Sequence, residues 1–387
     1  MYFDLSDEQL AVRDAAREFA QLELLPGVIE RDKNMIYPTE EIKKMGELGF
    51  LGMMVSPDYG GGGMDNVSYT LAIEEISKVD ASCSVIMSVN NSLVCRGIED
   101  FCNESQKAKY LPKIASGETI GAFCLSEPEA GSDATSQRTT AIDKGDHYLL
   151  NGTKNWITNG KTSKIHLVLA QSNIEAGYKG INAFIVESGW DGVDVGAKED
   201  KLGIRASDTT SIMYNDVKVP KENRIGDDGS GFKFAMNVLS GGRIGIAAQA
   251  LGIASGAFEL SLEYSKQREA FGKSISKHQA IAFKLADMGT QIEAARLLVH
   301  RAAWLKDKNM EYGPASSMAK LFASEVAMKF TPEAIQIHGG YGYVREYHVE
   351  RMMRDAKITQ IYEGTSEIQR IIISRNLLRG NLYEPIF

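Results

Sequence analysis

Glu363 is the side chain in this sequence with the clearest capacity for chemistry. It lies in residues 361–370, Ile-Tyr-Glu-Gly-Thr-Ser-Glu-Ile-Gln-Arg, with an apolar stretch before it and a helix-capping pattern after Gly364. A carboxylate held at the start of a helix in this way can face a substrate and act as a general base. The alternative is a solvated carboxylate at a helix start.

Two segments near the middle of the chain have residues that suit a flat ligand. Residues 124–133, Cys-Leu-Ser-Glu-Pro-Glu-Ala-Gly-Ser-Asp, follow a β-rich run, and their hydroxyls and backbone N–H groups can bind a heteroaromatic ring or an anion. A turn capped by side chains explains the same residues. Residues 156–158, Trp-Ile-Thr, place an indole and a hydroxyl on one side of a predicted strand, where the indole could cover a flavin ring. A core tryptophan is the alternative.

Two later segments could approach a ligand closely. Residues 336–343, Gln-Ile-His-Gly-Gly-Tyr-Gly-Tyr, form a Gly-rich turn after a predicted helix, although His338 itself is better explained as a packed or hydrogen-bonded histidine. Arg268 ends a long predicted helix close to Phe271, and a guanidinium beside an aromatic ring suits a pyrophosphate or an adenine. A charge that satisfies the helix dipole is the alternative.

Composition narrows the class of protein. The 387 residues carry a net charge of −8, which disfavours nucleic-acid binding because that requires a basic face. The four cysteines lack Cys-x-x-Cys spacing and the six histidines lack metal-ligand spacing, so we expect buried reduced thiols and no metal. We find no secretory signal and no run near the roughly 18 apolar residues of a membrane span. A cytoplasmic location is expected, or the mitochondrial matrix for a processed eukaryotic chain.

The hydrophobic period divides the chain into three parts. Helical spacing dominates at first, short β-rich runs separated by turn signals such as Asn151-Gly152 and Asn159-Gly160 follow, and long helical segments return after Pro220. Strands without intervening helices indicate an antiparallel sheet, and no Gly-x-Gly-x-x-Gly follows a strand. We therefore predict a multidomain α+β fold, with an N-terminal α-helical domain at 1–119, a middle antiparallel β domain at 120–225 and a C-terminal helical bundle at 226–387.

Taken together, these motifs resemble the acyl-CoA dehydrogenase family over essentially the whole chain. Residues 124–136 fit the family's first signature, and residues 336–355, which end in Glu-Arg-Met-Met-Arg-Asp, fit the second. Residues 88–93, 201–205, 242–247 and 355–365 are similar to the short-chain (butyryl-CoA) branch. The resemblance implies an N-terminal helical domain, a middle β domain and a C-terminal four-helix bundle, with FAD between the β domain and the bundle.

The resemblance also assigns residues to the two ligands. Contacts to FAD within one subunit would come from Phe123, Leu125, Ser126, Gly131, Ser132, Trp156, Thr158, Thr365 and Glu367. Contacts from a neighbouring subunit's copy would come from Arg268, Phe271, Gln279, Gln336, Gly339 and Gly340. The acyl-CoA groove would involve Ser132, Ser240, Arg243, Tyr362 and Gly364. Because the cofactor would be shared, the resemblance implies a homo-oligomer, and the family is usually a tetramer.

The reaction that the resemblance implies is α,β-dehydrogenation of an acyl-CoA thioester. A base would remove the pro-R α-proton while the β-hydrogen leaves as hydride to flavin N5, and an electron-transfer flavoprotein would accept the electrons. A carboxylate with a pKa of roughly 4.3 is too weak for this in water. Burial must raise its pKa, and hydrogen bonds from the Glu backbone N–H and the ribityl 2′-hydroxyl must stabilise the enolate.

The position of the base follows from one glycine. In the long-chain and isovaleryl branches, the base lies on another helix, one residue before an Arg that corresponds to Arg243. Here that position is Gly242, which leaves Glu363 as the candidate. Ser240 departs from the Asp that short-chain relatives often carry.

Several readings stay open at this stage. Butyryl-CoA is the expected substrate, and a branched, dicarboxylic or alicyclic acyl-CoA is the alternative. An oxidase that passes electrons to oxygen and a noncatalytic binding protein on the same scaffold are the rivals. The physiological direction, dehydrogenase or enoyl-CoA reductase, is not fixed by the sequence.

Overall fold

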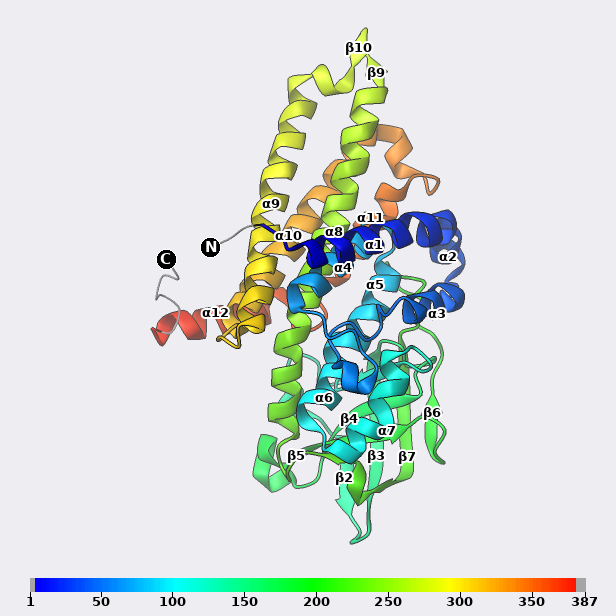
Figure 1. Cartoon of the computed structure of the whole chain (residues 1–387), viewed down its shortest axis with the longest axis vertical. Coiled ribbons are helices and arrows are strands. Elements are labelled where there is room, and N and C mark those ends of the chain that lie inside the picture. Colours follow the sequence, from blue (N-terminus) through cyan, green and yellow to red (C-terminus); the bar gives the residue numbers. More distant parts are fainter. Residues whose placement is uncertain (1–3, 381–387) are drawn as a thin grey trace.

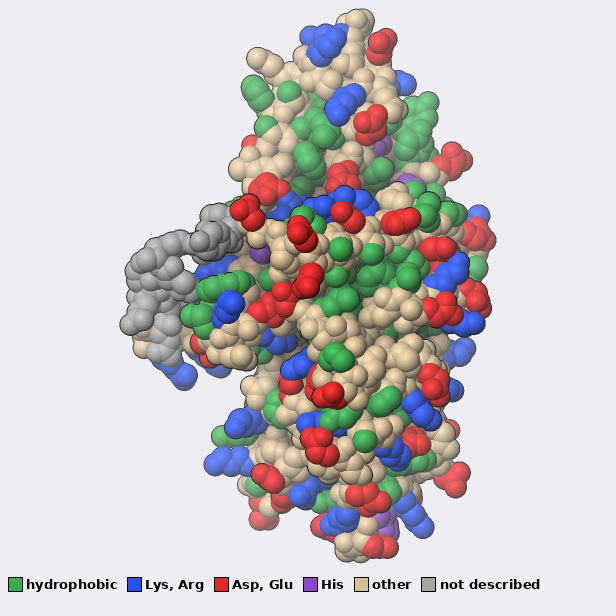
Figure 2. All heavy atoms as spheres, viewed as in Figure 1, with side chains coloured by type: hydrophobic (Ala, Val, Ile, Leu, Met, Phe, Trp, Pro, Cys, Tyr) green, Lys and Arg blue, Asp and Glu red, His purple; other side chains and the backbone are tan. Residues whose placement is uncertain are grey.

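The computed structural model describes residues 4–380 of the chain. The molecule is elongated, with a β-sheet at one end, a long helical hairpin at the other and the N-terminal helices between them (Figure 1). Figure 2 shows acidic and basic side chains interspersed over the same face, so neither sign of charge dominates it. The order of helices, sheet and helices is the predicted one.

The N-terminal part is helical because its apolar residues recur at helical spacing and its helices are capped. Ser6 and Gln9 form the expected capping box, in which each side chain accepts a hydrogen bond from the other's backbone N–H. The helices are α1 (Asp7–Phe19), α2 (Val28–Asn34), α3 (Thr39–Glu47), α4 (Asn66–Val79), α5 (Ala81–Ser88), α6 (Arg96–Phe101) and α7 (Glu104–Ala115).

A buried π-helical segment, Val89–Cys95, continues directly from α5. Its wider turn is held by two buried amides. Asn90 donates to Leu51 O at 2.9 Å and accepts from Gly121 N at 3.0 Å, while Asn91 accepts from Met53 N at 2.8 Å. Such local π-helical turns occur frequently at functional sites, and this one carries two residues of the cavity described below.

The middle part is a sheet with the order β6-β7-β3-β2-β4-β5-β8, and β1 pairs with β4. Its strands are β1 (Gly121–Cys124), β2 (Thr140–Asp143), β3 (His147–Ile157), β4 (Ile165–Gln171), β5 (Ile181–Glu187), β6 (Val193–Val195), β7 (Thr210–Pro220) and β8 (Arg224–Ile225). Most pairs are antiparallel, as predicted, but β1 runs parallel to β4, and β2 meets β4 in parallel through one residue pair. The chain returns to β4 by way of β2 and β3, a connection long enough for parallel pairing.

Asn151-Gly152 is not the turn that its dipeptide predicts. It lies within β3, where the register against β7 shifts between Leu150 and Gly152. Gly152 has a φ of +148°, and a Cβ there would come within 2.5 Å of Thr139 Oγ1. The glycine therefore serves a β-bulge with close backbone packing. Asn159-Gly160 does lie in a turn, as predicted.

The C-terminal part consists of α8 (Gly231–Gln267), α9 (Gln279–Asp307), α10 (Gly313–His338), α11 (His348–Ile358) and α12 (Ser366–Leu378). A short hairpin, β9 (Glu269–Ala270) and β10 (Lys273–Ser274), joins α8 to α9. Within residues 4–380, α8 is the helix long and apolar enough to cross a membrane, but 83% of its apolar window is buried inside the protein. Its glycines and polar residues interrupt the apolar run, so the sequence shows no continuous run of about 18 apolar residues there.

Successive side chains along a strand point to opposite faces of the sheet, and the buried residues therefore form two separate cores. Phe123, Leu167 and Leu169 face the helices and join their core, while Cys124 and Val168 face the second core, on the opposite side of the sheet. All four cysteines are buried and free, as expected for reduced thiols. The helix-facing side of the sheet, α8 and the α11–α12 connection are the surfaces that bound the site.

Candidate active site

A cavity of about 700 Å³ lies where the three parts of the chain meet. Twelve of the residues predicted as site residues line it: Phe123, Leu125, Ser126, Gly131, Ser132, Trp156, Thr158, Arg243, Tyr362, Glu363, Gly364 and Thr365. They come from β1, the loop after it, β3 and the turn after it, α8 and the α11–α12 connection. The fold thus gathers residues that are up to 242 positions apart in the sequence, from Phe123 to Thr365.

Glu363 lies in the connection between α11 and α12, on a backbone that few residues adopt. Its φ is +52° and that of Gly364 is +91°, so two consecutive residues are left-handed. A non-glycine residue in this region costs on the order of 1–3 kcal/mol and persists where the surroundings hold it. Thr365 then caps α12 by accepting from Ile368 N at 3.3 Å, which matches the predicted capping pattern.

The carboxylate of Glu363 is poorly solvated. Its Oε2 is buried and has no hydrogen-bond partner among the described residues. Burial raises the pKa of Glu363 to about 7, and the nearby positive charges of Lys320 and Arg243 oppose that rise. At neutral pH the group therefore lies close to the midpoint of its titration, where a general base works best.

Gly242 makes room for this carboxylate. A Cβ at Gly242 would come within 2.2 Å of Glu363 Oε2 and 2.6 Å of Leu93 Cδ2. A side chain on this turn of α8 would therefore occupy the space that the Glu363 carboxylate fills. Gly242, the position that the sequence resemblance assigns to the base in other branches, thus lies close to the base position predicted here.

The sheet side of the cavity presents an aromatic ring and hydroxyls. Trp156 has a φ of +62° and 61% of its surface exposed, so it is not the core tryptophan that was the alternative. Ser126 and Thr158 line the cavity beside it, and Asn155 N donates to Ser126 O at 2.9 Å. An exposed indole next to hydroxyls on a rigid sheet can cover and hydrogen-bond a flat polar ring.

A buried ion pair fixes the loop that carries Ser126. Lys154 is fully buried and donates to Glu127 Oε1 at 2.8 Å and to Leu125 O at 3.0 Å. The Glu127 carboxylate also accepts from the backbone N–H groups of Arg138 and Thr139. These bonds hold the signature segment in place from behind, which is a role that the motif alone does not reveal.

Apolar side chains line the part of the cavity that borders the N-terminal helices. Val85 from α5 and Val89 and Leu93 from the π-helical segment contribute to it. Tyr362 OH donates to Gln249 Oε1, and the Gln249 amide donates to Ala81 O at 2.9 Å. This hydrogen-bonded chain links α5, α8 and the Glu363 loop, so it fixes the walls of the cavity relative to one another.

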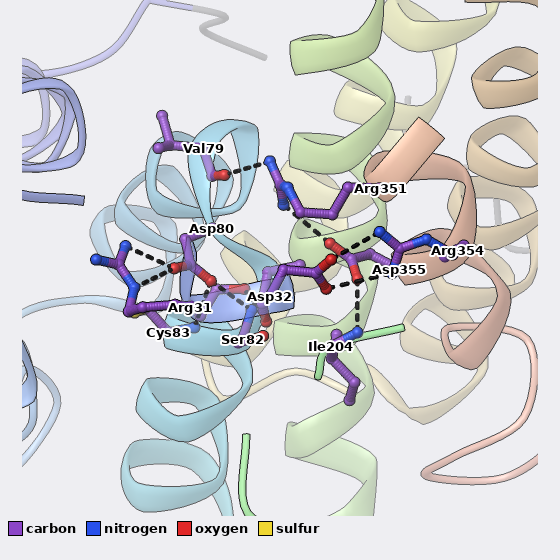
Figure 3. A network of polar contacts seen from close by, with 12 residues as sticks. Arg31, Asp32, Val79, Asp80, Ser82, Cys83, Ile204, Arg351, Arg354 and Asp355 are labelled. Carbon is purple, nitrogen blue, oxygen red and sulfur yellow. Dashed lines mark hydrogen bonds and ion pairs between the residues drawn. The ribbon is translucent and has the colours of Figure 1, made fainter. Parts of the chain in front are cut away.

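A polar network holds another wall, residues 201–204, against α11 (Figure 3). Asp355 Oδ1 accepts from Ile204 N at 2.5 Å and Asp355 Oδ2 accepts from Arg351 Nη1 at 2.9 Å. Arg354 donates to Asp32 Oδ2 at 2.7 Å and to Leu202 O at 3.2 Å. One network therefore ties α2, the middle part and α11 together beside the cavity.

Comparison with known proteins identifies the scaffold. Three family models match consecutive parts of the chain: the acyl-CoA dehydrogenase N-terminal domain at residues 6–118, the middle domain at 122–217 and the C-terminal domain at 229–378. This chain belongs to the acyl-CoA dehydrogenase family.

Individual acyl-CoA dehydrogenases resemble it closely. The short-chain specific acyl-CoA dehydrogenase of Clostridium acetobutylicum is 50% identical over 379 residues, which are 98% of this chain and 100% of that protein. Butyryl-CoA dehydrogenase from Megasphaera elsdenii has a TM-score of 0.96 at 49% identity, covering 98% of this chain and 100% of that one. A third similar chain comes from a structural study of the electron transferring flavoprotein of Acidaminococcus fermentans and its flavin-based electron bifurcation. Its TM-score is 0.97 at 53% identity, and the match covers 98% of this chain and 100% of that one.

These comparisons confirm the family resemblance, the fold class and the assignment as an enzyme. The chain is an acyl-CoA dehydrogenase, an oxidoreductase of a flavoprotein family. A flavin is therefore the cofactor that the cavity must be tested against. The exposed Trp156, the adjoining hydroxyls and the volume of the cavity fit a flat ring system with polar edges.

Eight predicted residues of this acyl-CoA dehydrogenase lie outside the cavity. Glu367 is exposed on the first turn of α12, and Ser240 donates to Met236 O at 2.8 Å on α8. The other six lie at the α8–α9 hairpin or at the end of α10: Arg268, Phe271, Gln279, Gln336, Gly339 and Gly340. The Arg268 guanidinium lies 5.7 Å from the Tyr341 ring, and Phe271 is 95% exposed. His338 is packed, as expected, since it stacks on Tyr264 at 4.3 Å and bonds Ala334 O.

Some residues that line the cavity of this acyl-CoA dehydrogenase were not predicted from the sequence. Phe232, Met236, Leu239 and the predicted Arg243 lie on one face of α8, and their spacing of four, three and four residues is a helical stripe that could have been recognised. Lys320 has no such signal. It is one of two lysines on α10, and it reaches the Gly364 carbonyl from 44 residues away.

Proposed function

We propose that this acyl-CoA dehydrogenase oxidises a short straight-chain acyl-CoA, butyryl-CoA to crotonyl-CoA, with FAD as cofactor and Glu363 as the base. The observation that carries the proposal is the Glu363 carboxylate, which lines the cavity and has a pKa raised to about 7. Its Oε2 is buried and has no hydrogen-bond partner in the part of the chain that the structure describes. A carboxylate so placed is available to take a proton from a bound substrate. Burial increases its basicity by making the charged form less stable.

The backbone of the same loop supports a second role. The N–H groups of Glu363 and Gly364 have no acceptor among the described residues, whereas the carbonyl of Gly364 is bound by Lys320 and Gln369. Free N–H donors beside the base could hydrogen-bond the thioester carbonyl and stabilise the negative charge that develops on it. The base and the N–H groups that bind the thioester carbonyl would then belong to one fixed turn.

The residues that would hold FAD are those of the sheet wall and the start of α12. Phe123, Leu125, Trp156, Ser126, Thr158 and Thr365 line the cavity, and Gly131 and Ser132 lie at its loop. When bound, the flavin would supply the hydride acceptor for the β-hydrogen. The chain's own part is to orient the ring and substrate and to exclude water.

The preference for a short chain is supported by the walls near Glu363. Val85, Val89 and Leu93 are apolar, and the Tyr362–Gln249 hydrogen bond closes α8 against the loop. An apolar lining favours an alkyl group over a second carboxylate, because burial of an unpaired charge is costly. Arg243, which also lines the cavity, is the group that could accept a carboxylate if this preference is wrong.

A substrate panel tests the preference. We expect the highest kcat/KM with butyryl-CoA among straight chains of four to twelve carbons, using a dye as electron acceptor. Isovaleryl-CoA, glutaryl-CoA and an alicyclic thioester complete the panel. Faster turnover of any of these three would replace the short straight chain by that class of substrate.

The proposed electron acceptor is an electron-transfer flavoprotein. The similarity to a chain from work on such a flavoprotein supports it. Peroxide measurement under air tests the oxidase alternative, because an oxidase would release one peroxide for each product molecule. A purified protein that is colourless and cannot be reconstituted with FAD would instead indicate a noncatalytic binding protein.

We further propose a homo-oligomer that shares FAD between copies. Six predicted FAD residues lie together at one end of the molecule, outside the cavity, and Phe271 is almost fully exposed. We expect a tetramer by light scattering. The variant Arg268→Ala should bind FAD more weakly while the oligomer stays intact. A monomer that retains its full complement of FAD would contradict the sharing.

A further inference from the structure

Lys320 is a buried lysine whose side chain ends at the Glu363 loop. It lies on α10, its exposed fraction is 0%, and Nζ donates to Gly364 O at 2.6 Å. No carboxylate lies within ion-pair distance of it among residues 4–380. An ammonium group that is buried without such a partner is costly, so a position of this kind calls for a physical explanation.

Lys154 provides an internal comparison. It is equally buried, but it has Glu127 at 2.8 Å as a partner, and it serves a loop behind the cavity wall. The strongest attractive charge acting on Lys320 is instead Glu363, although the two side chains are not in hydrogen-bond contact. The hydrogen bond of Lys320 goes to the backbone next to Glu363, which places its charge beside the carboxylate without neutralising it by direct contact.

We propose that Lys320 is a positioning residue for Glu363: its ammonium group holds the left-handed turn at Glu363 and Gly364 through the Gly364 carbonyl and keeps a positive charge beside the carboxylate. This inference rests on the proposed role of Glu363 as the base. It assigns to α10 a part in the reaction, although no residue of α10 lines the cavity.

The geometric part of the role follows from the carbonyl of Gly364. It accepts from Lys320 Nζ at 2.6 Å and from Gln369 Nε2 at 2.9 Å, so two donors from different helices fix one peptide group. Because the φ angles of Glu363 and Gly364 are both positive, the turn depends on outside contacts to remain in place. Loss of one donor should loosen the turn, and loss of the charged donor should loosen it more.

The electrostatic part follows from the groups that face Glu363. Lys320 on α10 and Arg243 on α8 are the positive charges that lower its pKa. Tyr362 beside it and Tyr69 on α4 are phenols whose pKa values are raised by burial, so they stay neutral. Tyr312 lies near Arg243, and Glu367 on α12 acts on Lys320.

The charges of Lys320 and Glu363 favour each other. Burial lowers the pKa of Lys320 to about 8, and the attraction of the Glu363 carboxylate opposes that fall. The ammonium form of Lys320 in turn lowers the pKa of Glu363, so each charged form stabilises the other. Removing this charge should raise the pKa of Glu363 further, so that a higher pH is needed to form the active carboxylate.

The test separates the charge from the hydrogen bond. Lys320→Gln keeps a donor without the charge, Lys320→Met removes both, and Lys320→Arg keeps the charge. Gln369→Met is the matched control, because it removes a neutral donor from the same carbonyl. The acid limb of kcat/KM against pH is measured for each FAD-loaded enzyme, and the Glu363 carboxyl band is followed by pH-difference infrared spectroscopy.

We expect the acid limb and the carboxyl titration to move up by about one pH unit in Lys320→Gln and Lys320→Met. Lys320→Arg and Gln369→Met should keep the original midpoint. At high pH, Lys320→Gln should recover more activity than Lys320→Met, because it keeps a donor to Gly364 O. If Lys320→Met does not fold, the comparison of Lys320→Gln with Lys320→Arg carries the same test.

Two failures can be told apart. If Glu363→Gln removes the carboxyl band and turnover but the midpoint is unchanged in Lys320→Gln, the role of Lys320 is wrong and that of Glu363 stands. If Glu363→Gln retains turnover with its acid limb intact, the proposed base itself is wrong. A loss of thermal stability without any change in the pH midpoint would reduce Lys320 to a structural residue.

Discussion

Two carboxylates eight residues apart, Asp355 and Glu363, show how similar burial can serve different ends. Burial raises the pKa of both, to about 6 for Asp355 and about 7 for Glu363. Asp355 has a partner for each oxygen, Ile204 N and Arg351 Nη1. Glu363 has an oxygen without any partner in residues 4–380, and it lines a cavity. A raised pKa alone therefore does not identify a reacting group, whereas an unpartnered oxygen in a cavity does so far better.

The backbone conformations of Asp355 and Glu363 also differ. Asp355 lies inside α11 in regular helical geometry. It accepts from Ile204 N and from Arg351, which also donates to Val79 O, so these bonds join three parts of the chain. Glu363 lies in a left-handed turn between helices and is held there by donors from α10 and α12. Asp355, which stabilises the fold, has satisfied hydrogen bonds and regular helical geometry. Glu363, which is proposed to react, has a strained backbone and a carboxylate oxygen that is not hydrogen-bonded within residues 4–380.

Substitution of the reacting carboxylate should have the largest effect on turnover. In Glu363→Gln we expect kcat to fall by about 1000-fold or more, since removal of a positioned base costs on the order of 10²–10⁴ and Gln accepts no proton at neutral pH. FAD and substrate should still bind. The measurement is dye reduction with butyryl-CoA, with the bound flavin monitored by its visible spectrum. Near-normal turnover would contradict the assignment of Glu363 as the base.

The same substitution should leave the fold intact. Gln keeps the shape of Glu, and Oε2 has no hydrogen bond to lose within the described part of the chain. We therefore expect the thermal midpoint to stay the same or to rise slightly. A marked loss of stability would mean that Glu363 resembles Asp355 more than the structure indicates.

Removal of Asp355 should reverse this pattern. In Asp355→Ala, Arg351 loses its buried ion-pair partner and Ile204 N–H loses its acceptor. Loss of one partner of a buried pair costs about 3–5 kcal/mol in the free energy of unfolding. Urea unfolding measures this loss, and Asp355→Asn, which keeps an oxygen, should lose less. Equal stability of the wild type and Asp355→Ala would remove the structural half of the comparison.

A smaller effect is expected when the space around Glu363 is filled. The Cβ of Gly242→Ala would lie 2.2 Å from Oε2, so the carboxylate must move. A displacement near 1 Å costs about 10²-fold in rate, so we expect kcat/KM to fall by about 10–100-fold. Gly241→Ala is the control, because its Cβ would meet the flexible end of Lys306 at 2.8 Å. Equal effects of the two variants would exclude a specific displacement of Glu363.

The pH dependence of activity should follow Glu363 and not Asp355. The pKa of Glu363 is raised, so the carboxylate form is lost as pH falls through about 7, and kcat/KM should drop by about tenfold per unit below it. Asp355→Asn should keep this acid limb at the same pH. A limb that moved with Asp355→Asn would show that the two carboxylates titrate together.

Much of this arrangement could be predicted from the sequence, and the failures have local causes. Periodicity places the long helices, and the signature residues Ser126, Trp156 and Glu363 do come together. Asn151-Gly152 was misassigned because a bulge and a hairpin turn both favour Gly with positive φ. The parallel pairing of β1 with β4 and the reach of Lys320 to Gly364 depend on contacts between distant segments, about which local patterns carry no information.

The close approach of Gly242 to the Glu363 carboxylate has an evolutionary consequence. Gly242 on α8 and Glu363 in the α11–α12 connection converge on one region, so exchanging Glu and Gly between them would deliver an acid to the same part of the cavity without rebuilding the scaffold. Selection would then preserve the location of the proton acceptor in space, while the sequence position that supplies it could change.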